Sequence, residues 1–539
     1  EAMAWITKTQ KVWLGSQLLN RVKPLDQIRY LNCLGDTTEM NGLVLGLFTK
    51  DDDPYHLTKI YTKASEEYDK QYDGRLSAAL TQAGPMPQAG QTRIFYGLDP
   101  IYSAVVVAGI GDECLGYNDV EQLDELKEGI RNASALGSKT MQSLFMRTIN
   151  VESFGNAESA AEGAAMGVWV YQEFKKSDNH VGIPKINLYN DCDYTGWQIG
   201  LQKAAAQNLA RQLCEMPGNL LTPIAFAQAA VEALCKSAIS VEVKVKEWAK
   251  IMKMHAFLAA ARGSCEPPIF LEISYYGCDP DIAPVVLIGK GVTFDSGGIC
   301  LKSCNEQRHM RGDMAGAACV VGTSRAVSAL QLPINLRCLI PLYENMPGPC
   351  ALKPGDIVKA RNGKTILVHD TDYDGRLSLA DALAYAMTYN PKFICDVGTL
   401  SKELSELFGE FATAVYSNND MLYEMMRVAS IHTGDRIWRM PLWNHFTEKV
   451  VTTPSSDVQD KLKDTGLPCT CAAFLREFLP PVDWIHLDTY AVMITDGVSH
   501  HYLRRGMSGK PTRTLVEFMA QLACKHSVAE PKQEKMAGA

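Results

Sequence analysis

The chain has 539 residues, of which 46% are hydrophobic and 21% charged, and its 61 acidic and 53 basic residues give a formal net charge of −8. These values are typical of folded globular domains and exclude long disordered stretches or a small disulfide-stapled scaffold. The acidic balance argues against nucleic acid as a partner, and no apolar run approaches the roughly 20 residues that span a bilayer. We therefore expect a globular protein of about two to four domains, with no nucleic-acid or membrane partner.

Residues 1–41 form a predicted N-terminal arm. Its first 25 residues carry Lys8, Lys11, Arg21 and Lys23 against one acidic residue, Glu1. Two interpretations stay open: a processed targeting segment, which would make the protein mitochondrial, and an irregular arm that packs on the body or on a neighbouring subunit. The sixteen cysteines are scattered and complete no zinc ribbon. We expect them to be small, reduced core residues, which is typical of a cytoplasmic protein.

Residues 42–190 are expected to form a smaller N-terminal α/β domain. Apolar runs from Leu43 to Phe48 and from Ser103 to Ile110 are rich in Val, Ile and Leu and indicate buried parallel strands. From Trp197 to Glu215, Leu, Ala and Gln recur at helical spacing until a Met-Pro-Gly-Asn turn ends the pattern. This pattern predicts a connecting helix within residues 191–215.

Residues 216–524 are expected to form a larger C-terminal α/β domain that is doubly wound. Short buried strands alternate there with helical segments, which favours a sheet covered by helices on both faces. The predicted strands are Ile269 to Tyr275, Pro284 to Ile288, Asn335 to Pro341, Phe393 to Val397 and Trp484 to Leu487. The tail from 525 to 539 is expected to be frayed.

One Gly-rich loop carries several charged residues directly after a predicted strand. Lys290 and Asp295 lie five residues apart, Lys302 follows on the same loop, and Asp313 opens a helix of small residues. Because open α/β sheets bind ligands at the carboxyl ends of their strands, we expect these side chains to lie at a functional site.

The segment 369–376 places Asp370, Asp372 and Asp374 at alternate positions, which share a face if the segment is extended. Three carboxylates on one face repel each other unless a cation lies among them. On spacing alone, a solvated loop with capped turns or a single calcium-type site remains open. The presence of the charged residues at 290–313 favours a pair of divalent ions.

Other catalytic signatures are incomplete. The chain has no Gly-x-Ser-x-Gly nucleophile elbow and no complete phosphate-binding loop. Gly289-x-Gly291 lacks the third glycine of a dinucleotide-binding turn.

Over roughly residues 42–524 the sequence resembles the leucine aminopeptidase (cytosol aminopeptidase) family. The resemblance lies in residues 289–298, 310–318, 344–347, 353–356, 361–365, 370–383 and 506–514. It implies a homohexamer of two-domain subunits whose C-terminal domain holds the active site. It also implies an aminopeptidase that releases N-terminal residues, preferentially Leu, from peptide substrates by a two-metal-activated hydroxide.

Carried over position by position, the resemblance implies two divalent cations per subunit, Zn or Mn. Their ligands would be Lys290, Asp295, Asp313, Asp372 and Asp374. Lys302 would polarise the scissile carbonyl, and Arg376 would hold a bicarbonate that relays a proton. The substrate side-chain pocket would contain Met310, Thr399, Leu400, Tyr490 and Met493.

The chain departs from the family at four of these positions or their neighbours. Asp374 stands where the family has Glu, Asp370 replaces Asn, Lys402 replaces Gly, and Tyr490 replaces a small residue. In this the chain is similar to the family's sperm-enriched paralogues, some of which have lost catalytic residues and serve as structural proteins. Two hypotheses follow: an aminopeptidase whose activity is retained, reduced or narrowed, and a catalytically impaired hexameric structural protein, as in sperm.

Overall fold

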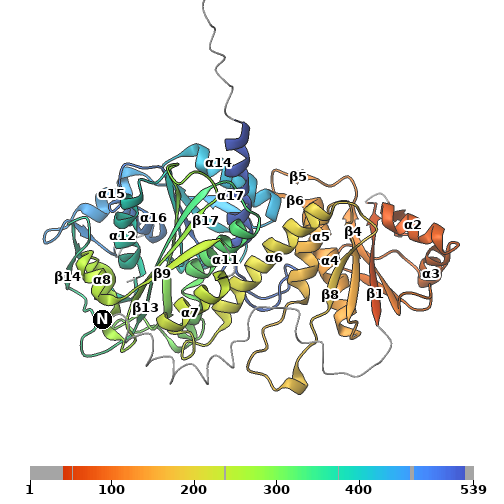
Figure 1. Ribbon diagram of the computed structural model, residues 1–539, viewed down its shortest axis with the longest axis horizontal. Coiled ribbons are helices and arrows are strands. Elements are labelled where there is room, and N and C mark those ends of the chain that lie inside the picture. Colours follow the sequence, from red (N-terminus) through yellow and green to blue (C-terminus); the bar gives the residue numbers. More distant parts are fainter. Residues whose placement is uncertain (1–39, 51–52, 236–237, 374, 462–465, 529–539) are drawn as a thin grey trace, which may run out of the picture.

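The computed structural model describes residues 40–50, 53–235, 238–373, 375–461 and 466–528 (Figure 1). Nearly all of the predicted N-terminal arm therefore lies outside the described residues, as do Asp374 and residues 529–539 of the predicted tail. The described chain forms a smaller N-terminal and a larger C-terminal α/β domain, each built on its own sheet, as predicted.

The N-terminal sheet has the strand order β3-β4-β1-β7-β8, with β2 paired to β1. The central strand β1 pairs in parallel with both β4 and β7, which confirms the prediction of buried parallel strands. The bounds are β1 Asn41–Thr49, β2 Ile60–Tyr61, β3 Thr92–Phe95, β4 Ala104–Asp112, β7 Thr148–Glu152 and β8 Lys185–Tyr189. A separate pair is formed by β5 Tyr117–Asn118 and β6 Leu123–Asp124.

Helices cover both faces of this sheet. Leu43 and Leu45 of β1 pack with helices α2 (Lys63–Gln71) and α3 (Arg75–Ala83). Val44, between them, belongs to the opposite core with α4 (Glu125–Ser143) and α5 (Ala157–Val168). Because successive strand side chains point to opposite faces, an uninterrupted apolar run is what a doubly covered strand requires.

Helix α6 (Tyr194–Glu215) lies between the two sheets in the chain, where the spacing of apolar residues predicts a connecting helix. It packs against α5 of the first domain and α11 (Ala315–Ala329) of the second. In Figure 1 it runs diagonally between the two bodies. The helix therefore belongs to the packing of both domains.

The C-terminal sheet has the order β18-β17-β20-β16-β11-β13-β10-β9, with β12 paired to β13. All five predicted strands are present: β10 Ile269–Tyr276, β11 Val285–Gly289, β13 Asn335–Asn345, β16 Phe393–Gly398 and β20 Trp484–Asp488. Four further strands were not predicted: β9 Ile239–Lys244, β12 Gly291–Asp295, β17 Thr413–Ser417 and β18 Ile437–Arg439. The sheet is parallel from β13 through β11 and β16 to β20, and antiparallel pairs flank this centre.

The central strands again divide their side chains between two cores. Leu287 of β11 packs toward one helical layer, and its neighbours Val286 and Ile288 pack toward the other. The first layer contains α7 (Pro223–Leu234), α11, α14 (Asp420–Thr433) and α17 (Thr512–Val528). The second contains α8 (Lys246–Ile251), α9 (His255–Ala260), α12 (Gly375–Ala386), α15 (Asn444–Val451) and α16 (Leu467–Arg476). This arrangement confirms the doubly wound α/β class.

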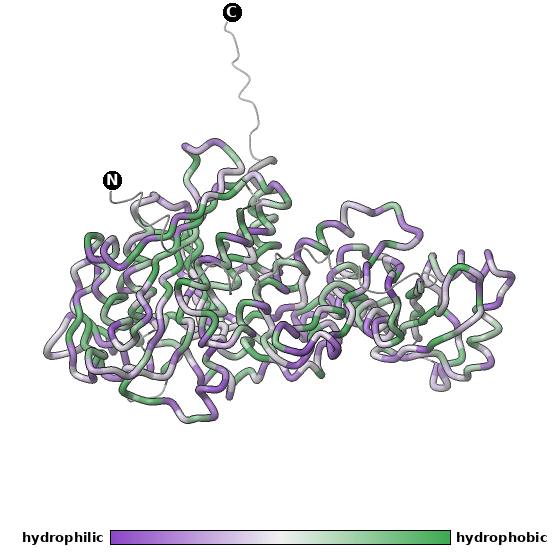
Figure 2. Tube along the Cα trace, turned by 60° about the horizontal axis from the view of Figure 1, so that its bottom comes forward, coloured by the Kyte–Doolittle hydropathy of each residue, from purple (hydrophilic) through white to green (hydrophobic). Residues whose placement is uncertain are grey.

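Two expectations about composition can be compared with the fold. In Figure 2 hydrophilic segments gather in the outer loops, and hydrophobic ones run through the sheets and their covering helices. None of the helices in the described ranges is long and apolar enough to cross a membrane. Of the fifteen described cysteines, seven are exposed and six buried, so the prediction that they are core residues is wrong for many of them. The small, weakly polar thiol tolerates either environment.

Candidate metal centre

The candidate site lies where three neighbouring parallel strands end. Lys290 follows β11, Thr399 follows β16, and Tyr490 comes shortly after β20. These strands are adjacent in the sheet, so their carboxyl ends meet at one edge. The side chains that the sequence places after these strands therefore lie at one edge of the sheet.

Lys290 and Asp313 form a buried ion pair at this edge. The Nζ atom of Lys290 lies 2.8 Å from both carboxylate oxygens of Asp313 and donates to the Thr399 carbonyl oxygen at 2.5 Å. The hydroxyl of Thr399 donates to Oδ1 of Asp313 at 2.6 Å. Burial raises the pKa of Asp313 to about 6, although the Lys290 ammonium group opposes that shift. The residue after β16 thus holds the pair in place.

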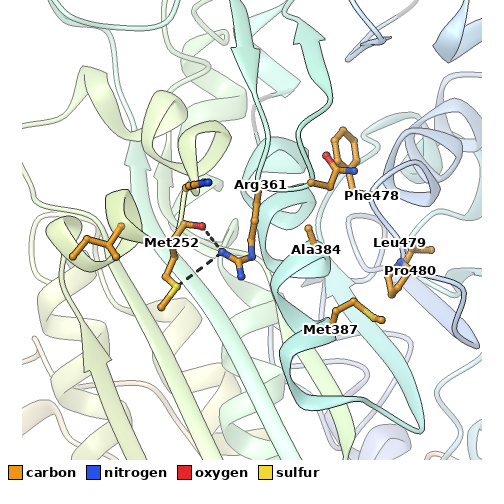
Figure 3. Close-up of a pocket in the computed structure, with 10 residues that line it drawn as sticks. Met252, Arg361, Ala384, Met387, Phe478, Leu479 and Pro480 are labelled. Carbon is orange, nitrogen blue, oxygen red and sulfur yellow. Dashed lines mark hydrogen bonds between the residues drawn. The ribbon is translucent and has the colours of Figure 1, made fainter.

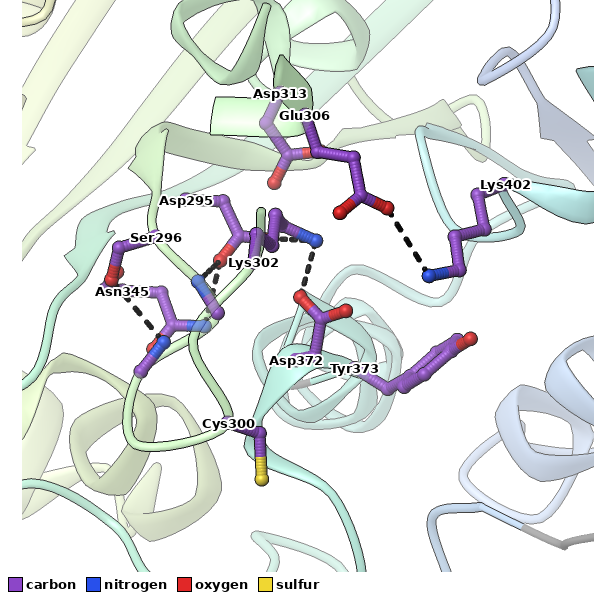
Figure 4. A network of polar contacts seen from close by, with 12 residues as sticks. Asp295, Ser296, Cys300, Lys302, Glu306, Asp313, Asn345, Asp372, Tyr373 and Lys402 are labelled. Carbon is purple, nitrogen blue, oxygen red and sulfur yellow. Dashed lines mark hydrogen bonds and ion pairs between the residues drawn. The ribbon is translucent and has the colours of Figure 1, made fainter. Parts of the chain in front are cut away.

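Lys302 lies between two further carboxylates. Its Nζ atom is 3.3 Å from Oδ2 of Asp295 and contacts Oδ1 of Asp372 (Figure 4). Oδ1 of Asp295 accepts hydrogen bonds of 2.8 Å from the Asn345 side chain and from the Gly297 N–H. Burial by itself lowers the pKa of Lys302, but the two carboxylates outweigh it and hold that pKa well above its usual value. Lys302 is therefore an ammonium group at neutral pH.

The segment that carries Asp372 is not extended, as the alternation of its acidic residues had suggested. Thr371–Tyr373 forms a single 3₁₀ turn, η4, so Asp370 and Asp372 do not share a face. Asp372 points toward Lys302, whereas Oδ2 of Asp370 pairs with the Lys461 ammonium group at 2.5 Å. The third acidic residue, Asp374, lies outside the described residues.

Arg376 is buried at the start of α12, 1% exposed. Its guanidinium group lies over the ring of Tyr373, 4.8 Å from the ring centroid, and its Nη1 donates to the Asp460 carbonyl oxygen. Its Nε and Nη2 atoms are buried and have no hydrogen-bond partner among the described residues. Two unpaired nitrogen donors on one buried cation favour an anionic ligand.

The cavity at this edge has a volume of about 20 Å³. Its lining combines the charged residues with the predicted pocket residues Thr399, Leu400 and Tyr490, and the full set is Lys290, Asp295, Lys302, Asp313, Asp372, Tyr373, Gly375, Thr399, Leu400, Lys402 and Tyr490. Met310 and Met493, also predicted for the pocket, are 2% and 3% exposed and lie in the hydrophobic core. The structure thus brings the two lysines and three aspartates together but places Arg376 and both methionines outside the cavity lining.

Three residues near the site were missed by sequence reasoning. Asn345 orients Asp295, Tyr373 covers Arg376, and Glu306 pairs with Lys402 through an Nζ–Oε1 distance of 3.3 Å. A signal existed for Glu306, because the sequence Ser303-x-x-Glu306 has the spacing of a capping box, which the structure shows at the start of α10 (Cys304–Gln307). Nothing in local spacing marks the other two, since their roles depend on contacts across the fold.

A larger hollow elsewhere in the domain does not share this chemistry. It has a volume of about 450 Å³ and is lined by residues of the α8–α9 turn, α12 and the segment after α16. None of its lining residues carries a carboxylate, and Nη1 of its Arg361 donates a hydrogen bond to the Met252 carbonyl oxygen (Figure 3). The smaller cavity is therefore the candidate site.

The donor atoms of the small cavity fit divalent cations. Within the described ranges no group of three or more Asp, Glu, His or Cys side chains is arranged to hold a metal ion, and the Lys302 ammonium group lies between Asp295 and Asp372. Oδ1 of Asp372 is buried and has the Lys302 ammonium group as its charged neighbour. Three carboxylates and a lysine amine on one small cavity form an oxygen-rich donor set of the kind that Zn²⁺ or Mn²⁺ accepts.

Comparison with known proteins decides the family. Sequence models described as the N-terminal domain and the catalytic domain of the cytosol aminopeptidase family match residues 44–178 and 208–516. The chain belongs to the cytosol aminopeptidase family. The cytosol aminopeptidases of Sus scrofa and Homo sapiens are 45% and 44% identical to it, over 89% of this chain and 93% of each relative.

Solved structures agree with this membership. The bottromycin maturation enzyme BotP in complex with Mn is 28% identical, with a TM-score of 0.77 over 90% of this chain and 100% of that chain. A mutant of tomato leucine aminopeptidase, 24% identical with a TM-score of 0.75, shares the fold. Since cytosol aminopeptidases are metal-dependent peptide hydrolases, membership of the family supports a metal-dependent aminopeptidase.

Proposed function

We propose that the chain is a di-metal aminopeptidase that releases N-terminal residues from peptides. The observation that carries this proposal is the convergence of Lys290, Asp295, Asp313 and Asp372 on one small cavity beside Lys302. These residues come from three separate segments of the chain, and no structural role in the sheet requires so many buried charges in one place.

The two ions, Zn or Mn, would be held by Lys290, Asp295, Asp313 and Asp372, with Asp374 as a fifth ligand from outside the described residues. When bound, such ions polarise a carbonyl group and make water available as a nucleophile near neutral pH. The complex of BotP with Mn supports a site of this class in a protein of the same fold.

Lys302 would act on the substrate directly. Its ammonium group lines the cavity and is 8% exposed, so a peptide carbonyl oxygen placed there meets a positive charge with little surrounding water. A fixed charge in such a setting offsets the negative charge that develops on the carbonyl oxygen during attack. Arg376, with two unpaired nitrogen donors, would hold a bicarbonate that accepts and returns a proton.

Metal content and turnover test this proposal together. The full chain, loaded with Mn or Zn, should contain two ions per subunit and hydrolyse amino-acid amides. Lys302→Met should reduce kcat by about 100-fold while the metal content stays unchanged, because it removes the charge that acts in the transition state. Lys353→Met, on an exposed lysine far from the cavity lining, is the matched control. Turnover that survives Lys302→Met would contradict the role given to Lys302.

A structural role is the second candidate, favoured by the small volume of the cavity. In that case a homohexamer would form and bind metal without turning over any amide. Sedimentation of the purified chain measures its oligomeric state. The family resemblance supports a homohexamer. The names of its relatives support a cytoplasmic location, and the mitochondrial alternative depends on residues 1–41, nearly all outside the described part of the chain.

A further inference from the structure

Two side chains at the candidate site reduce the space left for a substrate. Tyr490 comes from the segment after β20, and Lys402 directly precedes α13 (Glu403–Phe408). Both line the cavity whose volume is about 20 Å³. That space holds roughly one water molecule, so a substrate enters only when one of the two residues moves, and a larger side chain requires a larger movement.

The ring of Tyr490 has little freedom to move aside. The ring packs against the core cluster that contains Met310 and Met493. The backbone N–H of Tyr490 donates to Oδ1 of Asp488 at 3.2 Å. Protein cores are close-packed, and added volume there forces unfavourable rearrangement. Tyr490 therefore lies between the cavity lining and the core cluster to which both methionines belong.

Lys402 forms an ion pair at its far end. Its Nζ atom lies 3.3 Å from Oε1 of Glu306, and the other oxygen of Glu306 accepts bonds of 3.0 and 2.7 Å from the N–H and hydroxyl of Ser303. The capping box thus holds Glu306 while Lys402 reaches it from another segment (Figure 4). Both side chains are more than a third exposed, and such pairs contribute little stability, so this contact can open to admit a peptide.

We propose that Tyr490 and Lys402 make this chain select peptides with a small N-terminal residue, Ala or Gly, over those that begin with Leu. The inference rests on the aminopeptidase function proposed for the same cavity, and it departs from the Leu preference that the family resemblance implies. A pocket wall that excludes one methylene group lowers kcat/KM for the larger substrate by roughly 10- to 200-fold relative to the smaller one. The side chain of Leu is larger than that of Ala by more than one methylene group.

The test compares kcat/KM of the Mn-loaded full chain for Gly-, Ala- and Leu-amide. The wild type should favour Ala-amide over Leu-amide by at least about 10-fold. Tyr490→Ala, alone and with Lys402→Gly, should raise kcat/KM for Leu-amide by about 10-fold or more and change that for Ala-amide little. Tyr490→Phe should keep the wild-type preference, because the ring and not the hydroxyl fills the space. Tyr55→Ala, at an exposed tyrosine outside the cavity, should keep it too.

Binding separates this inference from the proposed function. Calorimetry with the aminoalkylphosphonate analogues of Ala and Leu measures selection without turnover. If no amide is hydrolysed but the Ala analogue binds at least about 10-fold more tightly, the proposed function fails and the selection stands. If the wild type binds the Leu analogue as tightly as the Ala analogue, or binds neither, the inference is overturned. A Tyr490→Ala variant that folds but gains no affinity for the Leu analogue overturns it as well.

Discussion

Asp370 and Lys461 form an ion pair beside the turn that carries Asp372. The two oxygens of Asp370 have separate partners, because Oδ2 contacts Lys461 and Oδ1 accepts the Asp372 N–H at 3.0 Å. Burial tends to raise the pKa of Asp370, but these partners prevail and lower it. The negative charge that replaces the family's Asn is thus offset locally, and the hydrogen bond that orients Asp372 does not require it.

Because the two oxygens of Asp370 have separate partners, we expect two substitutions of this residue to have different effects. Asp370→Asn keeps an oxygen for the Asp372 N–H and should change the Mn dissociation constant by less than about threefold. Asp370→Ala removes the acceptor and should weaken Mn binding by about 10- to 100-fold, as loss of a group that orients a ligand typically does. Equilibrium dialysis with metal analysis gives both constants. Equal effects of the two variants would show that the charge, and not the hydrogen bond, supports Asp372.

At the residue scale, the sequence indicated the position of residues at strand ends better than the conformation of the turn at Thr371–Tyr373. Lys290 and Asp295 could be placed because strand ends meet at one edge of a sheet. Asp370 and Asp372 were assigned to one face, yet the 3₁₀ turn separates them. Met310 and Met493 were assigned to the pocket, whereas burial places them in the core. Burial depends on partners from distant segments, which a single sequence does not reveal.

At the scale of elements, the loop after β12 is fastened to the turn η4. The hydroxyl of Thr371 donates to the Gly297 carbonyl oxygen at 2.8 Å and accepts the Cys300 N–H at 3.0 Å. The Asn345 side chain, from the end of β13, also bridges Asp295 and the Thr371 carbonyl oxygen. Three elements are therefore held in register by one hydroxyl and one amide.

Removal of that hydroxyl should loosen the site. Thr371→Val keeps the shape but leaves a buried carbonyl and a partly buried N–H without their partner, at a cost of about 1–3 kcal/mol in the free energy of unfolding. Thr371→Ser retains the hydroxyl and should cost less than the valine variant. Chemical denaturation of both variants measures the difference, and a serine variant that is the less stable of the two would contradict the assignment.

The strands were predictable to different degrees for physical reasons. The five predicted strands of the C-terminal sheet are largely buried on both faces, so apolar residues dominate their sequences. In β9, at the sheet edge, partly exposed residues alternate with exposed ones over most of the strand. β12 lies inside the Gly-rich segment that the sequence predicts to be a loop. Edge and loop-embedded strands owe their pairing to neighbours, which local propensity does not encode.

At the scale of the whole molecule, buried charges join the two domains. Glu162 of α5 accepts hydrogen bonds through Oε2 from Arg131 of α4 at 2.6 Å and from Arg513 of α17 at 2.7 Å. Arg513 also contacts Asp435 of the C-terminal domain at 3.2 Å. Because one carboxylate neutralises arginines from both domains, its loss leaves buried positive charges without a partner.

Glu162 should therefore make the stability of the molecule depend on pH in a defined window. Burial tends to raise the pKa of Glu162, but Arg131 and Arg513 outweigh it and lower the pKa from 4.5 to about 2. A carboxyl group whose pKa is lower in the folded state than in the unfolded state stabilises the folded state fully above the unfolded pKa. It loses this contribution as pH falls toward the folded pKa.

Glu162→Gln should thus lower the free energy of unfolding by about 3 kcal/mol at pH 7. The difference in Tm between wild type and variant should shrink below about pH 4.5 and nearly vanish near pH 2. Glu66→Gln, in an exposed pair with Lys70, should show a small difference throughout. A Tm difference for Glu162→Gln that stays constant between pH 7 and pH 3 would mean that packing, and not the shared charge, holds the domains together.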